Sequence, residues 1–349
     1  MPQTRTGFFS HSTRRRRASV FLMVASVLLL LVMALSMGFG SVFIKPSALF
    51  SAVFRTAGAD PVNVTIIWDL RLPRTLLAAL VGGALASAGA AFQGLFRNPL
   101  ADPHVIGASS GAALGATLAI AFGASGGALG FGPVPLCAFA GALATVAVVY
   151  AVAETGGGGA SVASLLLAGA ALGAMLSAMV SFLLIWRDQP WFHVFSWLLG
   201  GFSNRSWPHV QTALPWLLAG MGALWLMARP LDALLGGDDA ARSLGLPIRT
   251  TRLILVSAAG LAVAAAVAVS GIIGFVGLIA PHAARWLVGA GHARLMPMSA
   301  LLGAMLLVVA DTFARAIFAP GEIPVGIVTA TLGGPFFLYL LKTRGRRLA

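Results

Sequence analysis

Ten long apolar runs, separated by short polar or Gly/Pro-rich breaks, dominate this sequence of 349 residues. A helix needs about 20 apolar residues to cross a bilayer core roughly 30 Å thick. Backbone groups in lipid must be satisfied internally, which favours helices as the spanning elements. The pattern therefore predicts an all-α integral membrane protein with about ten transmembrane helices. The runs cover about residues 20–40, 75–96, 107–123, 134–153, 162–186, 208–228, 251–270, 274–290, 298–317 and 325–342.

The composition excludes several other classes of protein. Only 9% of the residues are charged, whereas a soluble domain carries about 25%. Cys137 is the single cysteine, so neither an intrachain disulfide nor a multi-cysteine metal site can form. The six histidines lack HxxxH and HExxH spacings, and no glycine is followed by lysine, which excludes a P-loop. We expect no cofactor in this chain, so any ATP and Mg would bind a separate ATPase chain.

The basic residues are distributed as expected for a membrane protein with both termini in the cytoplasm. Arginines 14–17 precede the first run, and basic residues follow the last one. With ten spans, 16 of the 23 Lys and Arg residues lie inside and seven outside, in agreement with the positive-inside rule. We therefore predict a basic cytoplasmic tail over residues 1–18 and a ten-helix domain over residues 19–345. Lysine occurs only twice, so the net charge of +13 does not indicate nucleic-acid binding.

The predicted cytoplasmic loop after the sixth run is longer than a connector requires. Residues 231–247 predict two short helices joined by Gly236 and Gly237, with Asp238 or Asp239 as N-cap and Gly245 as the C′ residue of the second. Most connections need only a few residues, so this loop favours a docking element over a solvated linker.

Three further patterns lie in or beside the spans. Asp311 and Arg315 are four residues apart in a helix, so they can pair near its outer end. The spacing of Gly169 and Gly173 allows either close helix packing or a glycine-lined pore wall. Six of the eight tryptophans lie between the fifth and sixth runs or inside the ends of these runs, which predicts that residues 187–207 form an interfacial outer segment with a short helix.

Several stretches together resemble the FecCD-type permeases of ABC importers. The resemblance covers nearly all of residues 65–345, and it is carried by the combination of motifs. The matching stretches are Arg71-Leu72-Pro73-Arg74, Arg97-Asn98-Pro99-Leu100-Ala101-Asp102-Pro103, Leu198-Leu199-Gly200-Gly201-Phe202-Ser203, Ala240-Ala241-Arg242-Ser243-Leu244-Gly245, Gly274-Phe275-Val276-Gly277-Leu278 with Pro281-His282, Ala310-Asp311 to Arg315, and Pro324-Val325-Gly326.

This resemblance implies a type II ABC importer permease in the bacterial inner membrane. It implies a homodimer with the pore at the interface between two copies, two cytoplasmic ABC ATPase subunits and a periplasmic substrate-binding protein. The residues that match the family's docking arginines are Arg71, Arg74 and Arg315. Those that match its coupling helices are Asp238, Asp239, Ala240, Ala241, Arg242, Ser243, Leu244 and Gly245. The residues expected along the translocation path are Gly169, Gly173, Met175 and Met179.

For the function, the resemblance implies import of an iron chelate, either a ferric siderophore or haem, because iron chelates dominate the family. Cobalamin is the alternative substrate. Gly200-Gly201-Phe202-Ser203 departs from the Gly-Ser that is more usual in many siderophore permeases, which leaves the identity of the substrate open. An ion-coupled secondary transporter is the alternative of another class. Such transporters usually carry acids in mid-span, whereas all ten acids here lie near span ends or in loops.

Overall fold

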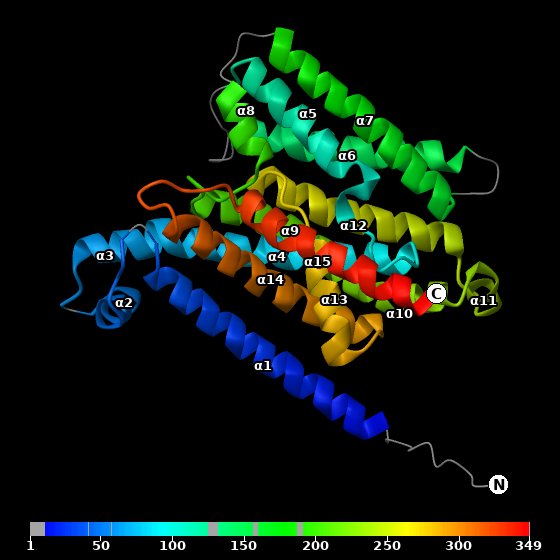
Figure 1. Ribbon diagram of the computed structural model, residues 1–349, viewed down its shortest axis with the longest axis horizontal. Helices are drawn as coiled ribbons and strands as arrows, with labels where there is room; N and C mark the ends of the chain where they lie inside the picture. Colours follow the sequence, from blue (N-terminus) through cyan, green and yellow to red (C-terminus); the bar gives the residue numbers. More distant parts are fainter. Residues whose placement is uncertain are drawn as a thin grey trace.

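The computed structural model describes residues 11–348, apart from 41, 57, 125–131, 156–159 and 187–190. Within these residues every regular element is helical, so the all-α membrane fold is confirmed (Figure 1). A helix coincides with each predicted run. These helices are α1 (His11–Gly38), α4 (Leu72–Leu95), α5 (Ala108–Ala121), α6 (Pro133–Glu154), α7 (Val162–Trp186), α9 (Trp207–Leu226), α12 (Ile248–Ser270), α13 (Val276–Val288), α14 (His292–Ala316) and α15 (Val325–Leu348).

The number of complete spans differs from the prediction. Among the described residues, seven helices are long and apolar enough to cross a bilayer, and α9 with α10 (Ala228–Leu235) forms an eighth that is bent by 49°. Helices α5 and α13 have only 14 and 13 residues. At 1.5 Å per residue they extend about 20 Å, which is short of the hydrocarbon core. Their first residues follow Gly107 (φ 79°) and Phe275 (φ 67°), which adopt left-handed backbone conformations in front of them.

Helix α4 is the centre of the bundle, and all but three of its 24 residues are buried. It packs against α9, α12, α13 and α14. Its small residues permit this, since a Cβ at Gly82 would overlap the backbone of Gly303 on α14. A Cβ at Gly89 would likewise overlap the backbone of Gly277 on α13. Backbones approach closely at such points, as is common between membrane helices.

Helices α5, α6 and α7 form a layer on one side of α4 and α12, and α1 lies along α14 on the other side (Figure 1). Gly111 on α5 faces Gly141 of α6, and Gly115 faces the backbone of Cys137. Over residues 20–35 most of α1 is exposed, and apart from Ser26 the exposed side chains are apolar, as expected for a helix in contact with lipid.

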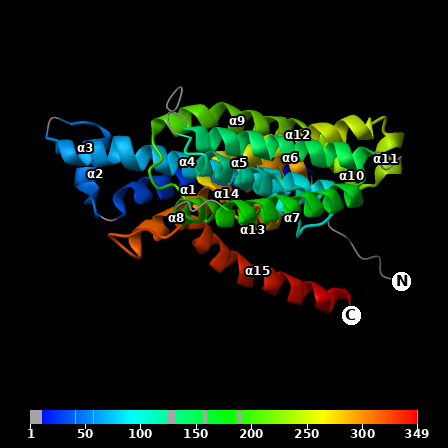
Figure 2. The same ribbon diagram turned by 90° about the horizontal axis from the view of Figure 1, so that it is seen from above.

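The two ends of the bundle carry different short elements (Figures 1 and 2). The end named here the α3 end bears α2 (Pro46–Val53), α3 (Pro61–Thr65) and the π-helical turn η1 (Ile66–Arg71). The opposite end, named the α11 end, bears α10 and α11 (Asp238–Ser243), together with the start of α1 and the end of α15. The predicted short helix in residues 187–207 is α8 (Trp191–Leu198), and Arg187 lies outside the described residues.

Candidate functional site

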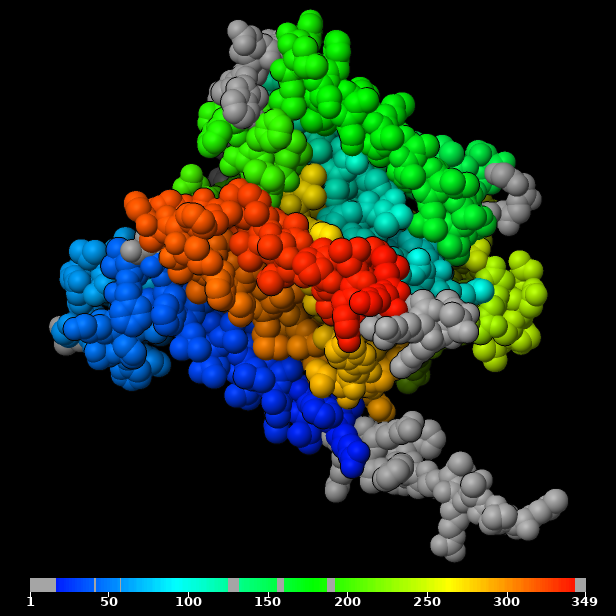
Figure 3. All heavy atoms as spheres, viewed as in Figure 1, coloured from blue at the N-terminus to red at the C-terminus, as the bar shows by residue number. Residues whose placement is uncertain are grey.

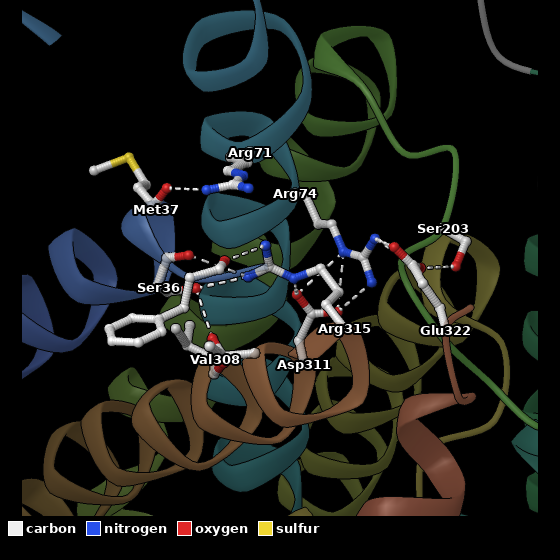
Figure 4. Close-up of polar contacts among 11 residues, drawn as sticks. Ser36, Met37, Arg71, Arg74, Ser203, Val308, Asp311, Arg315 and Glu322 are labelled. Atoms are coloured by element: carbon white, nitrogen blue, oxygen red, sulfur yellow. Dashed lines mark hydrogen bonds and ion pairs between the residues drawn. The ribbon is translucent and has the colours of Figure 1, made fainter. Parts of the chain in front are cut away.

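A buried ion-pair cluster joins α4 to α14 at the α3 end (Figure 4). Arg74 donates to both oxygens of Asp311 at 2.8–3.1 Å and to both oxygens of Glu322 at 2.9 Å. Arg315 donates to the other side of Asp311 at 3.1 Å, which confirms the pair predicted from their spacing. Asp311 is thus paired with two arginines, and its side chain is only 1% exposed.

Polar groups near the end of α1 accept hydrogen bonds from the guanidinium groups of Arg71 and Arg315. Arg71 donates to the carbonyl oxygens of Met37, at 2.7 Å, and of Val42. Arg315 donates to the hydroxyl of Ser36 at 2.9 Å and to the carbonyl of Phe39 at 3.2 Å. These contacts connect α1, α4 and α14 at one point.

The three arginines predicted to dock a binding protein are therefore brought together, but they are buried. Arg71, Arg74 and Arg315 are 6%, 8% and 5% exposed. Groups of the same chain already occupy their donors, so in this conformation they present little charge to a partner. Docking by these residues stays a prediction.

Glu322 connects this cluster to the segment between α8 and α9. Its carboxylate accepts a hydrogen bond from the Ser203 hydroxyl at 2.6 Å. Burial opposes its ionisation, but the Ser203 hydroxyl and the Arg74 guanidinium outweigh burial and hold the pKa of Glu322 below its ordinary value. A cavity of about 620 Å³ lies here, with Arg71, Arg74, Arg205, Arg315 and Glu322 among its walls. Positive side chains thus outnumber negative ones around this cavity.

Glu322 and Ser203 were not among the sequence-predicted site residues. Glu322 is 248 residues from Arg74 in the chain, and Ser203 is 119 residues from Glu322. Residues so far apart in the chain form no local sequence motif that would show that they meet. The one available signal was the position of an acid in the loop that follows the run containing Arg315.

At the α11 end, the predicted pair of short helices is present. Helices α10 and α11 meet at Gly236 and Gly237, and Gly245 follows α11 with the left-handed φ of 77° expected at C′. The predicted N-cap is wrong, because Gly237 occupies that position. The Asp238 carboxylate instead accepts hydrogen bonds from Arg97 and Arg252.

The residues predicted to contact the ATPase divide into two groups. Ala241 is buried and Asp238 is half-buried against the bundle. The other group is exposed, and it includes the apolar side chain of Leu244, which is 74% exposed. The exposed residues are Asp239, Ala240, Arg242, Ser243, Leu244 and Gly245.

The motif after α4 makes a compact polar turn. Arg97 has a φ of 48°, and the Asn98 side chain accepts from the backbone N–H of Leu100 at 3.0 Å. Asp102 caps the short helix η2 (Pro103–Ile106) by accepting from the N–H of His104 at 2.9 Å. The His104 ring lies 3.0 Å from the carbonyl oxygen of Ile273, so the turn is tied to the break between α12 and α13.

The four residues predicted for the translocation path do not share one face of α7. Gly169 is buried against the backbone of Val105 and Ile106, and a Cβ at Gly173 would lie 3.4 Å from the Ser110 hydroxyl. These glycines therefore pack against η2 and α5. Met175 and Met179 are 54% and 46% exposed on a different side. A role in transport stays a prediction for all four.

A recess is visible between α7 and α15 on the face shown in Figure 3, with parts of α5 and α12 at its floor. In the 18-residue apolar window of each of these two flanking helices, only 22% is buried within the chain. Within the described parts of the chain, no group of three or more His, Cys, Asp or Glu residues is placed to hold a metal ion.

The sequence profile of the FecCD transport family matches residues 28–343. The chain belongs to the FecCD transport family. This FecCD protein is 46% identical over 287 residues to the cobalamin import system permease protein BtuC of Halobacterium salinarum. The match covers 82% of this chain and 76% of that protein. It is 41% identical to the hemin transport system permease protein HmuU of Yersinia pestis, over 92% of this chain and 96% of that protein.

A solved structure agrees with this assignment. The FecCD chain superposes with a TM-score of 0.81 on an inward-facing structure described as a metal-chelate type ABC transporter. The two share 34% identity, and the match covers 92% of this chain and 98% of that one. The FecCD protein is therefore the multi-pass permease component of an ABC importer, a component that is not itself catalytic.

Proposed function

We propose that this FecCD protein moves an iron chelate, either a ferric siderophore or haem, from a periplasmic binding protein to the cytoplasm. The observation that supports this most is the 41% identity to a hemin permease over 92% of the chain, beside a metal-chelate type structural relative. The protein would reside in the bacterial inner membrane with both termini, including the basic tail of residues 1–18, in the cytoplasm.

Cobalamin is the second candidate substrate. It is favoured by the 46% identity to a cobalamin permease, although that match covers less of the chain. Both substrates are large, rigid metal complexes that one wide pathway can pass.

The proposed assembly contains two copies of this chain, two ABC ATPase subunits and one binding protein. The recess between α7 and α15 supports a pore completed by the second copy. The exposed face of α11, with Asp239, Arg242 and Leu244, supports contact with an ATPase at this end. ATP and Mg would bind the ATPase, and this chain needs no cofactor of its own.

In this mechanism the permease performs no chemistry. Closure of the ATPase dimer displaces α10 and α11 and shifts the helices between outward-open and inward-open states. An ion-coupled mechanism finds less support, because Asp311, the buried acid of α14, is paired with both Arg74 and Arg315. A proton- or sodium-coupled transporter needs an acid that can exchange its cation.

The test is uptake into proteoliposomes that contain this chain and its ATPase. Hemin, a ferric siderophore and cobalamin are each presented on a cognate binding protein. The control is the same assembly with the P-loop lysine of the ATPase replaced. ATP-dependent uptake of hemin or the siderophore supports the proposal, and uptake of cobalamin alone would replace it with the second candidate. Uptake driven by an ion gradient without ATP would overturn the importer mechanism.

A further inference from the structure

One carboxylate on α11 pairs with two arginines of the helix bundle. Asp238 is the first residue of α11, and its two oxygens accept hydrogen bonds from the same nitrogen of Arg252 at 2.9 and 2.8 Å. The Arg97 guanidinium donates to it as well, at 2.9 Å. The Arg252 side chain is 12% exposed and the Asp238 side chain is 34% exposed, so this ion pair is partly shielded.

Both arginines extend the connection to other elements. Arg97, just after α4, also donates to the carbonyl of Leu234 on α10 at 3.1 Å. Arg252, in the first turns of α12, also donates to the carbonyl of Ala160, just before α7, at 3.0 Å. One carboxylate thus joins α11 to the ends of α4, α7 and α12.

A second carboxylate fixes α10 in the same manner. Asp232 accepts from the backbone N–H of His292 at 3.1 Å and lies 2.5 Å from its ring Nδ1. His292 is the first residue of α14 and is 2% exposed. The two short helices are therefore anchored to the bundle by acids on one side, while Asp239, Arg242 and Leu244 project from the other.

We propose that Asp238 is a positioning residue that transmits displacement of α10 and α11 to α4, α7 and α12. This inference rests on the proposed function, in which an ATPase moves these short helices. The sequence placed Asp238 among the residues in contact with the ATPase, and the structure turns it towards the bundle. Charge-assisted hydrogen bonds from arginine are directional, so a push on α11 is passed on through this carboxylate.

An amide at position 238 breaks this link with little change of shape. In Asp238→Asn, Arg252 and Arg97 lose their shared negative partner, and α11 can move without the helices behind it. Asp238→Glu restores the charge. The matched control is Glu154→Gln, because Glu154 pairs at 2.5 Å with Arg249 of the same helix, α12, and the Arg249 side chain is 77% exposed. That pair joins α6 to α12 and includes no part of α10 or α11.

The first measurement compares ATP hydrolysis with hemin uptake in the complete importer. For Asp238→Asn we expect ATP hydrolysis within about twofold of wild type and uptake at least about tenfold lower, as for loss of a partly shielded ion-pair partner. Asp238→Glu should recover most of the uptake, and Glu154→Gln should match wild type. A proportional fall of hydrolysis and uptake, or an equal effect of Glu154→Gln, would overturn the proposal.

The second measurement needs no partner protein. Amide hydrogen exchange of the full chain in lipid nanodiscs should become faster in Asp238→Asn at α11, at residues 97–103 and at the start of α12, and it should stay unchanged there in Glu154→Gln. Unaltered exchange in Asp238→Asn would show that the link does not hold these elements together. If the wild-type importer moves no substrate, the proposed function fails, and this measurement still decides whether the link exists.

Discussion

Glu322 is the residue on which the loops at the α3 end depend. Its carboxylate accepts hydrogen bonds from Arg74 on α4 and from Ser203 in the segment after α8. Its pKa is held below the ordinary value for glutamate, about 4.3. A group with a depressed pKa in the folded state stabilises the fold above its unfolded pKa. That stabilisation is lost as the pH falls through the folded pKa.

We therefore predict that Glu322→Gln lowers the midpoint of thermal unfolding at pH 7. The difference from wild type should shrink as the pH falls below about 4. The glutamate is partly exposed, so the loss should be about 1 kcal/mol or less. Asp60→Asn is the control, because Asp60 is an acid at the same end that caps α3 and asparagine caps equally well. A pH-independent difference for Glu322→Gln would contradict the ion-pair role.

Asp311 should be far less tolerant of substitution. It is 1% exposed and is the carboxylate shared by Arg74 and Arg315. Removing one partner of a buried ion pair costs about 3–5 kcal/mol, because the remaining charges are left uncompensated. We expect Asp311→Asn to reduce the yield of folded protein sharply. The double variant Asp311→Asn with Arg315→Met should lose less than the sum of the two single variants in detergent melting curves. Strict additivity would show that the pair is not coupled.

Among the elements, α4 depends on glycine for its approach to α13. A Cβ at Gly89 would overlap the backbone of Gly277, whereas a Cβ at Gly222 on α9 would meet nothing within 4 Å. Alanine should stabilise a helix by about 1 kcal/mol relative to glycine where there is space. We predict that Gly222→Ala raises the melting temperature or leaves it unchanged, and that Gly89→Ala lowers it and impairs uptake. Equal behaviour of the two variants would contradict the close contact.

The long helices were predictable from the sequence, and the short elements and polar partners were less so. The apolar run over residues 75–96 predicts α4, because a helix needs about 20 apolar residues to cross the bilayer core. The runs over residues 107–123 and 274–290 were already shorter than the others, but the left-handed backbone at Gly107 and Phe275, where α5 and α13 begin, was not predictable. The sequence placed Asp238 at the start of a short helix, but the direction of its side chain depends on Arg97 and Arg252. These arginines meet Asp238 only through tertiary packing.

For the whole molecule, the proposed homodimer requires that one exposed face of the chain meets the second copy. Helices α1, α7 and α15 are all largely exposed, but only α7 and α15 flank the recess (Figure 3). A helix in contact with lipid and a helix beside a shared pore can expose equally apolar side chains. Composition therefore does not distinguish these two kinds of helix, whereas a measurement of proximity between the two copies does.

We predict that a cysteine at Met179 of α7 cross-links two copies through a short bifunctional thiol reagent in the membrane. The background is Cys137→Ser, because the native Cys137 is exposed. The control is a cysteine at Val27 of α1, which is 61% exposed against 46% for Met179. If α7 lines the shared pathway, only the Met179→Cys variant gives a dimer band on gels, and hemin on its binding protein changes the yield. Equal cross-linking at both positions would indicate random collision, and cross-linking at Val27 alone would place α1, not α7, at the interface.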